Sequence, residues 1–303
     1  MEEIKMTVLF EQLFLLYAFM LFGYIFGKSG IIAHEHSKVL STIAVYIFLP
    51  CNVFKAFSKN FTLDYIKSYY PFLLASMAIL TGIIIAVHFA AKLFSKKPYD
   101  RKVYEYSLIV PNGGYMGAPL AESLFGAQGL LNNIVFNIPI SIYIYTLGFC
   151  MLTKRSLTLK KLCNPVMITM LAGAIVGLCG IELPNAINTF VAKSSDCMAP
   201  TAMLLAGISM SEFKAKDLLL SPKAYIASAI KVLIIPLFVF AVLKPFASTE
   251  MLRAGVLLHA MPCGLNSIVF AKLVDEDCHT GARLALISNL LAILTIPIFI
   301  SLI

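Results

Sequence analysis

Long apolar blocks separated by short polar breaks run along the whole chain. A transmembrane helix needs about 20 predominantly apolar residues, and most of the blocks reach that length. No break is long enough to hold a soluble domain. The pattern predicts an all-α polytopic membrane protein with about ten spans, at residues 8–27, 37–58, 70–94, 102–124, 129–152, 164–180, 186–211, 222–243, 250–274 and 280–302.

The chain contains an internal repeat. The stretch 23–31, Gly-Tyr-Ile-Phe-Gly-Lys-Ser-Gly-Ile, recurs at 173–181 as Gly-Ala-Ile-Val-Gly-Leu-Cys-Gly-Ile. Pro50 and Pro111 recur in the same order as Pro200 and Pro262. Each half then holds an odd number of spans, so the halves must enter the membrane from opposite sides. We expect two inverted five-helix repeats, 1–152 and 164–303, joined by the loop 153–163.

Positive charge predicts the orientation. Far more loop lysines and arginines lie on the side opposite the N-terminus than on its own side. By the positive-inside rule, both termini lie outside and the loop 153–163 is cytoplasmic in a plasma-membrane protein. Met1–Lys5 carries two Glu against one Lys, which is a poor signal peptide, so we expect the first segment to be retained as a span.

The composition agrees with a lipid environment. Hydrophobic residues make up 59% of the chain and charged residues 13%, with a mean hydropathy of +0.86. A soluble domain carries about 25% charged residues. The net charge of +8 does not indicate nucleic acid, because the basic residues lie between apolar blocks. The cysteines form no CxxC pair and the acidic run 275–277 looks like a solvated turn, so neither a metal nor a cofactor is expected.

Two predicted spans cannot be continuous helices. The fourth carries Pro111, Asn112, Gly113 and Gly114 near its middle, and the ninth carries Pro-Cys-Gly at 262–264. Proline removes a backbone donor, and glycine supports non-helical angles. Interrupted backbone at mid-membrane depth is tolerated where it lines a cavity or is buried in protein. A matched pair of interruptions therefore indicates a substrate site rather than two ordinary kinks.

Such breaks expose both poles of a helix. The half-helices that begin near Tyr115 and Asn266 turn N–H groups and a partial charge of about +0.5 toward the centre, which suits a carboxylate. The preceding half-helices turn carbonyls there, so a cation stays an alternative to the favoured small organic anion. Asn52 follows Pro50 and frames the cavity from another span. The predicted substrate-binding residues are Asn52, Asn112, Gly113, Gly114, Tyr115, Cys263, Gly264, Asn266 and Ser267.

Ionisable residues inside predicted spans are candidates for a proton or cation relay. Asp196 lies one turn after Lys193, so these two residues either neutralise each other or leave Asp196 as a relay. His259 is a second relay candidate because histidine titrates near neutrality, although packing is an alternative role. Lys231 either snorkels or pairs with an acid.

The residues around both breaks resemble the auxin efflux carrier family, which includes plant auxin carriers and bacterial relatives described as malonate transporters. The matching stretches are 111–120, Pro-Asn-Gly-Gly-Tyr-Met-Gly-Ala-Pro-Leu, and 261–272, Met-Pro-Cys-Gly-Leu-Asn-Ser-Ile-Val-Phe-Ala-Lys. The family pattern has Thr at the position of Gly113, and plant members often have Gln at the position of Cys263. Both departures bear on the substrate.

The resemblance implies a mechanism. Spans 1, 2, 6 and 7 would form a scaffold, which is also the expected contact of a homodimer. Spans 3–5 and 8–10 would form a moving unit around a crossing created by Pro111 and Pro262. Asn112 would contact a substrate carboxylate, and the anion would cross by elevator-like alternating access.

Two other functions were weighed. A sodium-coupled organic-anion symporter on the related bile-acid-transporter plan would use the broken helices to hold cations. An intramembrane enzyme is disfavoured, since the spans contain no GxSxG, HExxH or GxGD motif.

Overall fold

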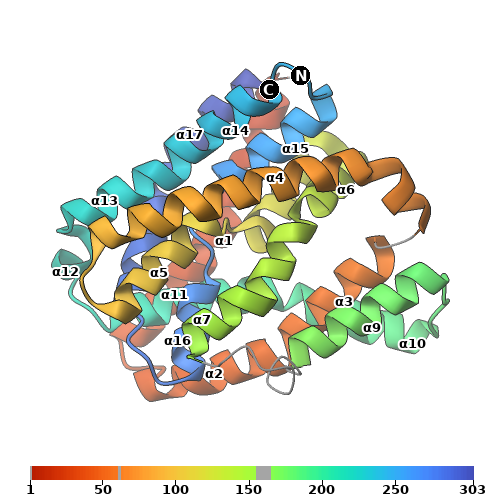
Figure 1. Cartoon of the computed structure of the whole chain (residues 1–303). Coiled ribbons are helices and arrows are strands. Elements are labelled where there is room, and N and C mark those ends of the chain that lie inside the picture. The colour runs from red at the N-terminus through yellow and green to blue at the C-terminus, as the bar shows by residue number, and fades with distance from the viewer. Residues whose placement is uncertain (1, 61–62, 155–164) are drawn as a thin grey trace.

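The computed structural model describes residues 2–60, 63–154 and 165–303, and these residues are almost entirely helical (Figure 1). The helices are α1 (Glu2–Lys28), α2 (Ser37–Ile43), α3 (Leu49–Asn60), α4 (Leu63–Phe94), α5 (Pro98–Ile109), α6 (Ala118–Tyr143), α7 (Phe149–Thr153), α9 (Pro165–Cys179), α10 (Asn185–Asp196), α11 (Met198–Ser211), α12 (Ala215–Leu219), α13 (Pro222–Ala229), α14 (Ile235–Leu243), α15 (Thr249–Ala260), α16 (Asn266–Leu273) and α17 (His279–Leu302). Gly126, with φ +70°, turns the chain inside α6 between the fourth and fifth predicted spans.

Five helical segments are long and apolar enough to cross a membrane. They are Ser37–Lys59, Tyr69–Phe94, Gln128–Thr153, Pro222–Leu243 and His279–Leu302. Leu13–Lys28 and Ile168–Cys179 are shorter apolar helices. The all-helical, multi-span class is therefore confirmed, and the inverted arrangement of ten spans stays a prediction.

Prolines widen several helices. A proline lacks an N–H and clashes with the carbonyl four residues earlier, and one π-helical turn relieves both problems. Three π-helical turns each end two residues before a proline: Ala44–Phe48 before Pro50, Gly113–Gly117 before Pro119 and Ile230–Ile234 before Pro236. Near Pro200, α10 gives way to α11 at Cys197.

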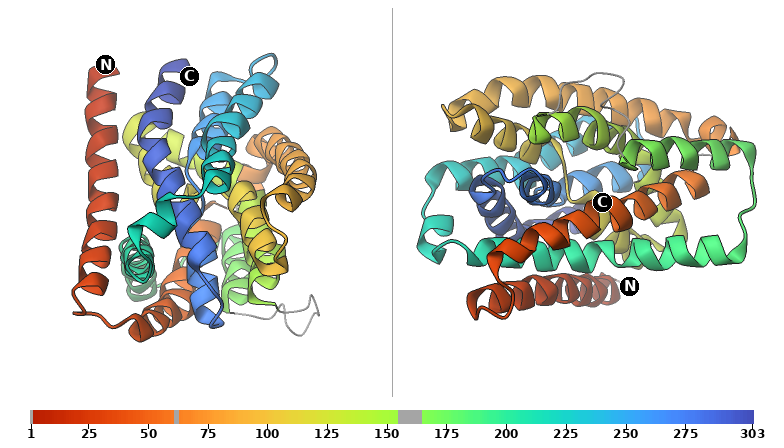
Figure 2. Two further views of the ribbon diagram at one scale, coloured as in Figure 1. Left: turned by 90° about the vertical axis from the view of Figure 1, so that its left-hand side faces the viewer. Right: turned by 90° about the horizontal axis from the view of Figure 1, so that it is seen from below.

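The helices pack in two groups. In one, α1 packs on α11, and α3 packs on α9 and α10. In the other, α4–α7, α13–α15 and α17 pack mainly among themselves (Figure 1), and α16 packs on α7 and α17 of this group as well as on α2 and α11 of the first. α1 begins and α17 ends at the same end of the molecule, whereas α2 and α16 lie at the opposite end (Figure 2).

Glycines bring α1 and α11 into backbone contact. A Cβ on Gly207 would lie 2.0 Å from the Met20 carbonyl oxygen, and one on Gly23 would lie 2.2 Å from that of Leu204. Small residues at such contacts are typical of helices packed in membranes, because close approach maximises van der Waals contact.

We expect Gly207→Ala to destabilise the protein by about 1–3 kcal/mol, because the added methyl group meets backbone that cannot rotate away. Gly82→Ala in α4 is the matched control, since a Cβ there has no neighbour within 4 Å. The measurement is the thermal unfolding midpoint in detergent. Equal midpoints for the two variants would contradict the packing.

Candidate functional site

Both predicted helix interruptions are present. α5 ends at Ile109, and Val110 is extended with φ −92° and ψ 113°. α15 ends at Ala260, and Met261 is extended with φ −64° and ψ 145°. Each helix therefore stops directly before its Pro-containing motif, as the local chemistry of proline and glycine requires.

The two extended stretches meet and pair as a short antiparallel bridge. The Asn112 N–H donates to the Pro262 carbonyl at 2.8 Å, and the Gly264 N–H donates to the Val110 carbonyl at 3.0 Å. In this bridge Pro111 lies opposite Cys263. Backbone N–H and carbonyl groups that lose helical partners at one break form hydrogen bonds with the other break. This pairing lowers the free-energy cost of interrupting a helix in an apolar interior.

A cavity of about 590 Å³ lies beside this bridge. α3 and α10 form one wall, and the turn 113–117 with α6 forms the other. Of the predicted site residues, Asn52, Gly113, Gly114 and Asp196 line it. The structure thus brings residues of four predicted spans to one space.

Gly113 and Gly114 supply open backbone donors. They begin a helical segment, so their N–H groups have no partner within it, and neither group has an acceptor elsewhere in the described part of the chain. A Cβ on Gly114 would have no neighbour within 4 Å. The helix start, with its partial positive charge, therefore lies at the cavity wall.

Three polar residues of α6 extend this surface. Asn133, Asn137 and Ser141 line the cavity at one-turn spacing. Asn133 Nδ2 and Asn137 Oδ1 are buried and have no partner among the described residues. Sequence reasoning missed this polar stripe, although the i, i+4, i+8 pattern on an apolar helix was the signal that could have revealed it.

Asn112 lies behind the cavity wall. It is 2% exposed, and both polar atoms of its side chain lack a partner among the described residues. The departure at Gly113 has a packing consequence, because a Cβ there would lie 2.4 Å from Leu258 Cδ1 and 3.3 Å from Asn137 Oδ1. Leu258 occupies the space that a threonine side chain would take.

The second break contributes less to the cavity. The Cys263 N–H donates to Ser288 Oγ at 3.1 Å, and Ser267 Oγ donates to the Gly264 carbonyl at 3.2 Å. Cys263, Asn266 and Ser267 are buried, and none of them lines the cavity. Bonds within the protein use the N–H groups of Cys263 and Gly264, and the expectation of N–H groups presented at the start of α16 stays a prediction. The side chain of Tyr115 lies outside the described residues.

The charges at the cavity balance. Lys55 Nζ pairs with Asp196 Oδ1 at 3.1 Å, so the expected neutralisation of Asp196 by Lys193 is wrong. The bond joins α3 to α10, a tertiary contact that neighbours in sequence could not reveal. Lys59 and Glu122 also line the cavity.

Two further ionisable residues lie within the protein interior. His259 is 1% exposed, its Nδ1 donates to the Gly255 carbonyl at 2.9 Å, and it does not line the cavity. Lys231 is fully buried and donates to the Leu108 carbonyl at 3.1 Å. It therefore neither snorkels nor pairs with an acid of the described chain, contrary to both expectations.

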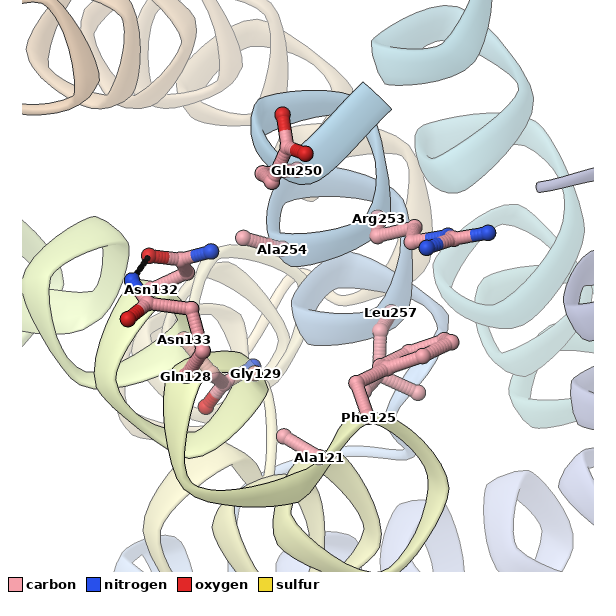
Figure 3. Close-up of a pocket in the computed structure, with 10 residues that line it drawn as sticks. All are labelled: Ala121, Phe125, Gln128, Gly129, Asn132, Asn133, Glu250, Arg253, Ala254 and Leu257. Carbon is pink, nitrogen blue, oxygen red and sulfur yellow. Dashed lines mark hydrogen bonds between the residues drawn. The ribbon is translucent and has the colours of Figure 1, made fainter. Parts of the chain in front are cut away.

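A smaller cavity of about 210 Å³ adjoins the first and shares Asn133 with it. Figure 3 shows Gln128 and Asn132, joined by a hydrogen bond, facing α15. The Arg253 guanidinium turns away from them, and its Nε donates to the Ile303 carbonyl oxygen. Within the described residues, no group of three or more His, Cys, Asp or Glu could hold a metal ion.

Comparisons with known proteins cover nearly the whole chain. A family model described as membrane transport protein matches residues 8–158 and 153–300. The uncharacterized transporter MJ1031 of Methanocaldococcus jannaschii is 27% identical over 92% of this chain and 94% of its own length. The uncharacterized transporter YfdV of Escherichia coli is 21% identical over 93% of each chain. An uncharacterized transporter of Methanothermobacter thermautotrophicus is 23% identical over 92% of this chain and 93% of its own.

We expect a thiol at position 141 to react from the cavity. In a variant without native cysteines, Ser141→Cys should react with a charged methanethiosulfonate about tenfold or more faster than Ser228→Cys, because only the exposed thiol reaches the aqueous reagent. Ser141 lines the cavity, whereas Ser228 is fully buried. The labelling rate in detergent is the readout, and equal rates would contradict an accessible cavity.

Proposed function

The chain belongs to the membrane transport protein family, that of the auxin efflux carriers, and we propose that this membrane transporter carries a small organic anion. The proposal is transport rather than catalysis. It rests on the fully open donors of Gly113 and Gly114 at the 590 Å³ cavity beside the paired breaks.

A carboxylate fits this donor set. Two backbone N–H groups at a helix start bind an anion without a buried cation. Asn133 and Asn137 add amide groups whose buried polar atoms lack described partners, and Asn52 adds another amide from α3. The volume falls in the range of small-molecule sites, about 300–1,000 Å³. The balanced lining charges favour a substrate held by hydrogen bonds rather than by net attraction.

The arrangement of the two helix groups supports alternating access. The cavity lies between α3 and α10 of the first group and α6 of the second. We assign the first group, α1–α3 and α9–α11, as the scaffold and the second as the moving unit. Both termini outside the cytoplasm and a homodimer through the scaffold remain parts of this proposal.

Among the described residues, the ion pairs between the groups lie at the end of the molecule farthest from the termini. Lys38 of α2 pairs with Asp275, and Lys272 of α16 pairs with Glu212. Ser41 Oγ donates to the Val269 carbonyl at 2.7 Å. Burial raises the pKa of the nearby Cys278 thiol to about 11, as expected where water is excluded. An elevator motion would have to break these contacts and close the cavity.

We expect Asn137→Ala to weaken substrate binding about tenfold or more, because a hydrogen bond to a charged group contributes about 1.5–3 kcal/mol. Purified protein is heated with a panel of mono- and dicarboxylates, and uptake into vesicles is measured for the anion that stabilises it.

Asn132→Ala is the matched control, since Asn132 lies on the same helix but bonds to Gln128 and does not line the main cavity. Full ligand response in Asn137→Ala, or an equal loss in Asn132→Ala, would rule out this placement of the site.

Breaking the ion pair between Lys272 and Glu212 should shift the protein toward the state in which the cavity is closed. The side chains of Lys272 and Glu212 are only 15% and 19% exposed, so Lys272→Gln removes a largely buried contact between the groups. We expect the labelling rate of Ser141→Cys to fall about threefold as the cavity-open population decreases.

The pairing is tested by exchange. Lys272→Glu combined with Glu212→Lys should restore the rate, whereas Lys154→Gln should leave it unchanged, because Lys154 and its partner Glu276 both belong to the moving unit. An unchanged rate in Lys272→Gln would show that this pair does not hold the state.

A further inference from the structure

Lys231 is the most deeply buried charge-bearing residue at the crossing. It lies in the π-helical turn Ile230–Ile234, and its side chain has no exposed surface. None of the carboxylates whose side chains the structure describes forms an ion pair with its Nζ. An ammonium group without a partner in such a place would be strongly disfavoured, so what compensates it must be found in the backbone.

The compensation comes from the end of a broken helix. Lys231 Nζ donates to the carbonyl of Leu108 at 3.1 Å, and Leu108 lies in the last turn of α5. The last four carbonyls of a helix receive no hydrogen bond from an N–H group of the same helix. The helix end carries a partial charge of about −0.5. The ammonium therefore occupies the negative pole of α5, directly before the bridge.

The neighbouring carbonyls have other partners. The Tyr106 carbonyl accepts from the Val110 N–H at 2.8 Å, and the Val110 carbonyl accepts from the Gly264 N–H at 3.0 Å. The carbonyl of Leu108, which lies between Tyr106 and Val110 in the sequence, accepts from Lys231. Its bond to Leu108 places the ammonium at the end of α5, next to the first break.

We propose that Lys231 is a resident cation, which occupies the position where carbonyl ends of broken helices would otherwise hold a coupling metal ion. Half-helix carbonyl ends coordinate Na⁺ or protons in transporters with discontinuous helices. Here a covalently attached ammonium takes that role. Along the chain, Leu108, whose carbonyl binds the ammonium, precedes the bridge, and the N–H groups of Gly113 and Gly114 follow it.

This inference deepens the proposed function and rests on it for one consequence. With an anion at the N–H groups, the ammonium leaves the crossing close to neutral without a second bound ion. Uptake should then proceed without sodium, which argues against the sodium-coupled alternative.

The decisive experiment measures thermal stability, because it does not depend on knowing the substrate. Wild type, Lys231→Ala and Lys223→Ala are heated in equal concentrations of sodium, potassium, methylammonium or N-methylglucamine chloride. Lys223 is the matched control, since its Nζ also donates to a helix-end carbonyl, that of Phe94 at the end of α4, at 3.2 Å.

The resident-cation proposal predicts a pattern. The unfolding temperature of wild type should not depend on the salt, and neither should that of Lys223→Ala. Lys231→Ala should unfold at a lower temperature in N-methylglucamine and regain about 2–4 °C in one of the small cations, because the vacated site can bind it. Cation-specific stabilisation of wild type, or its absence in Lys231→Ala, would overturn the proposal.

Uptake by wild type tests the resident-cation role independently, even if Lys231→Ala does not fold. Replacing sodium by N-methylglucamine should change the rate less than twofold, and a sodium requirement would overturn the resident-cation role. If no carboxylate is transported at all, the proposed function fails, while the stability experiment still decides the role of Lys231.

Discussion

The whole arrangement depends on satisfying backbone hydrogen bonds where two helices stop inside an apolar protein. A broken helix leaves several N–H and carbonyl groups without partners, and each costs several kcal/mol if it stays buried and unbonded. The antiparallel pairing of Asn112 with Pro262 and of Gly264 with Val110 removes part of that cost. Neither interruption would be tolerable alone, so the two breaks stabilise each other as one unit. The surrounding helices must hold both in register.

The two breaks are related in sequence but differ in what they leave open. At the second break, the N–H of Cys263 bonds to Ser288 and that of Gly264 bonds across the bridge. At the first, Gly113 and Gly114 keep their N–H groups toward the cavity. Two breaks with similar motifs therefore differ in how the N–H groups that follow their prolines are used.

The sequence predicted what local chemistry determines. Proline and glycine set the stops at Ile109 and Ala260, and the apolar blocks set the helices, because both effects act within a few residues. It could not predict contacts made by folding. The partner of Asp196 is Lys55 on another helix, and that of Lys231 is a carbonyl. The sequence shows that Asn137 is a polar residue in an apolar segment. Only the orientation of α6 in the folded protein places it at the cavity.

Electrostatics joins these features. A helix broken at mid-depth exposes a negative pole at the end of its first half and a positive pole at the start of its second. In this chain α5 ends against the Lys231 ammonium, and the next segment begins with open N–H groups at the cavity. The negative pole thus already has its cation, while the positive pole faces space that an anion can enter. This division of the two poles is the physical basis of the proposal that the substrate is an anion.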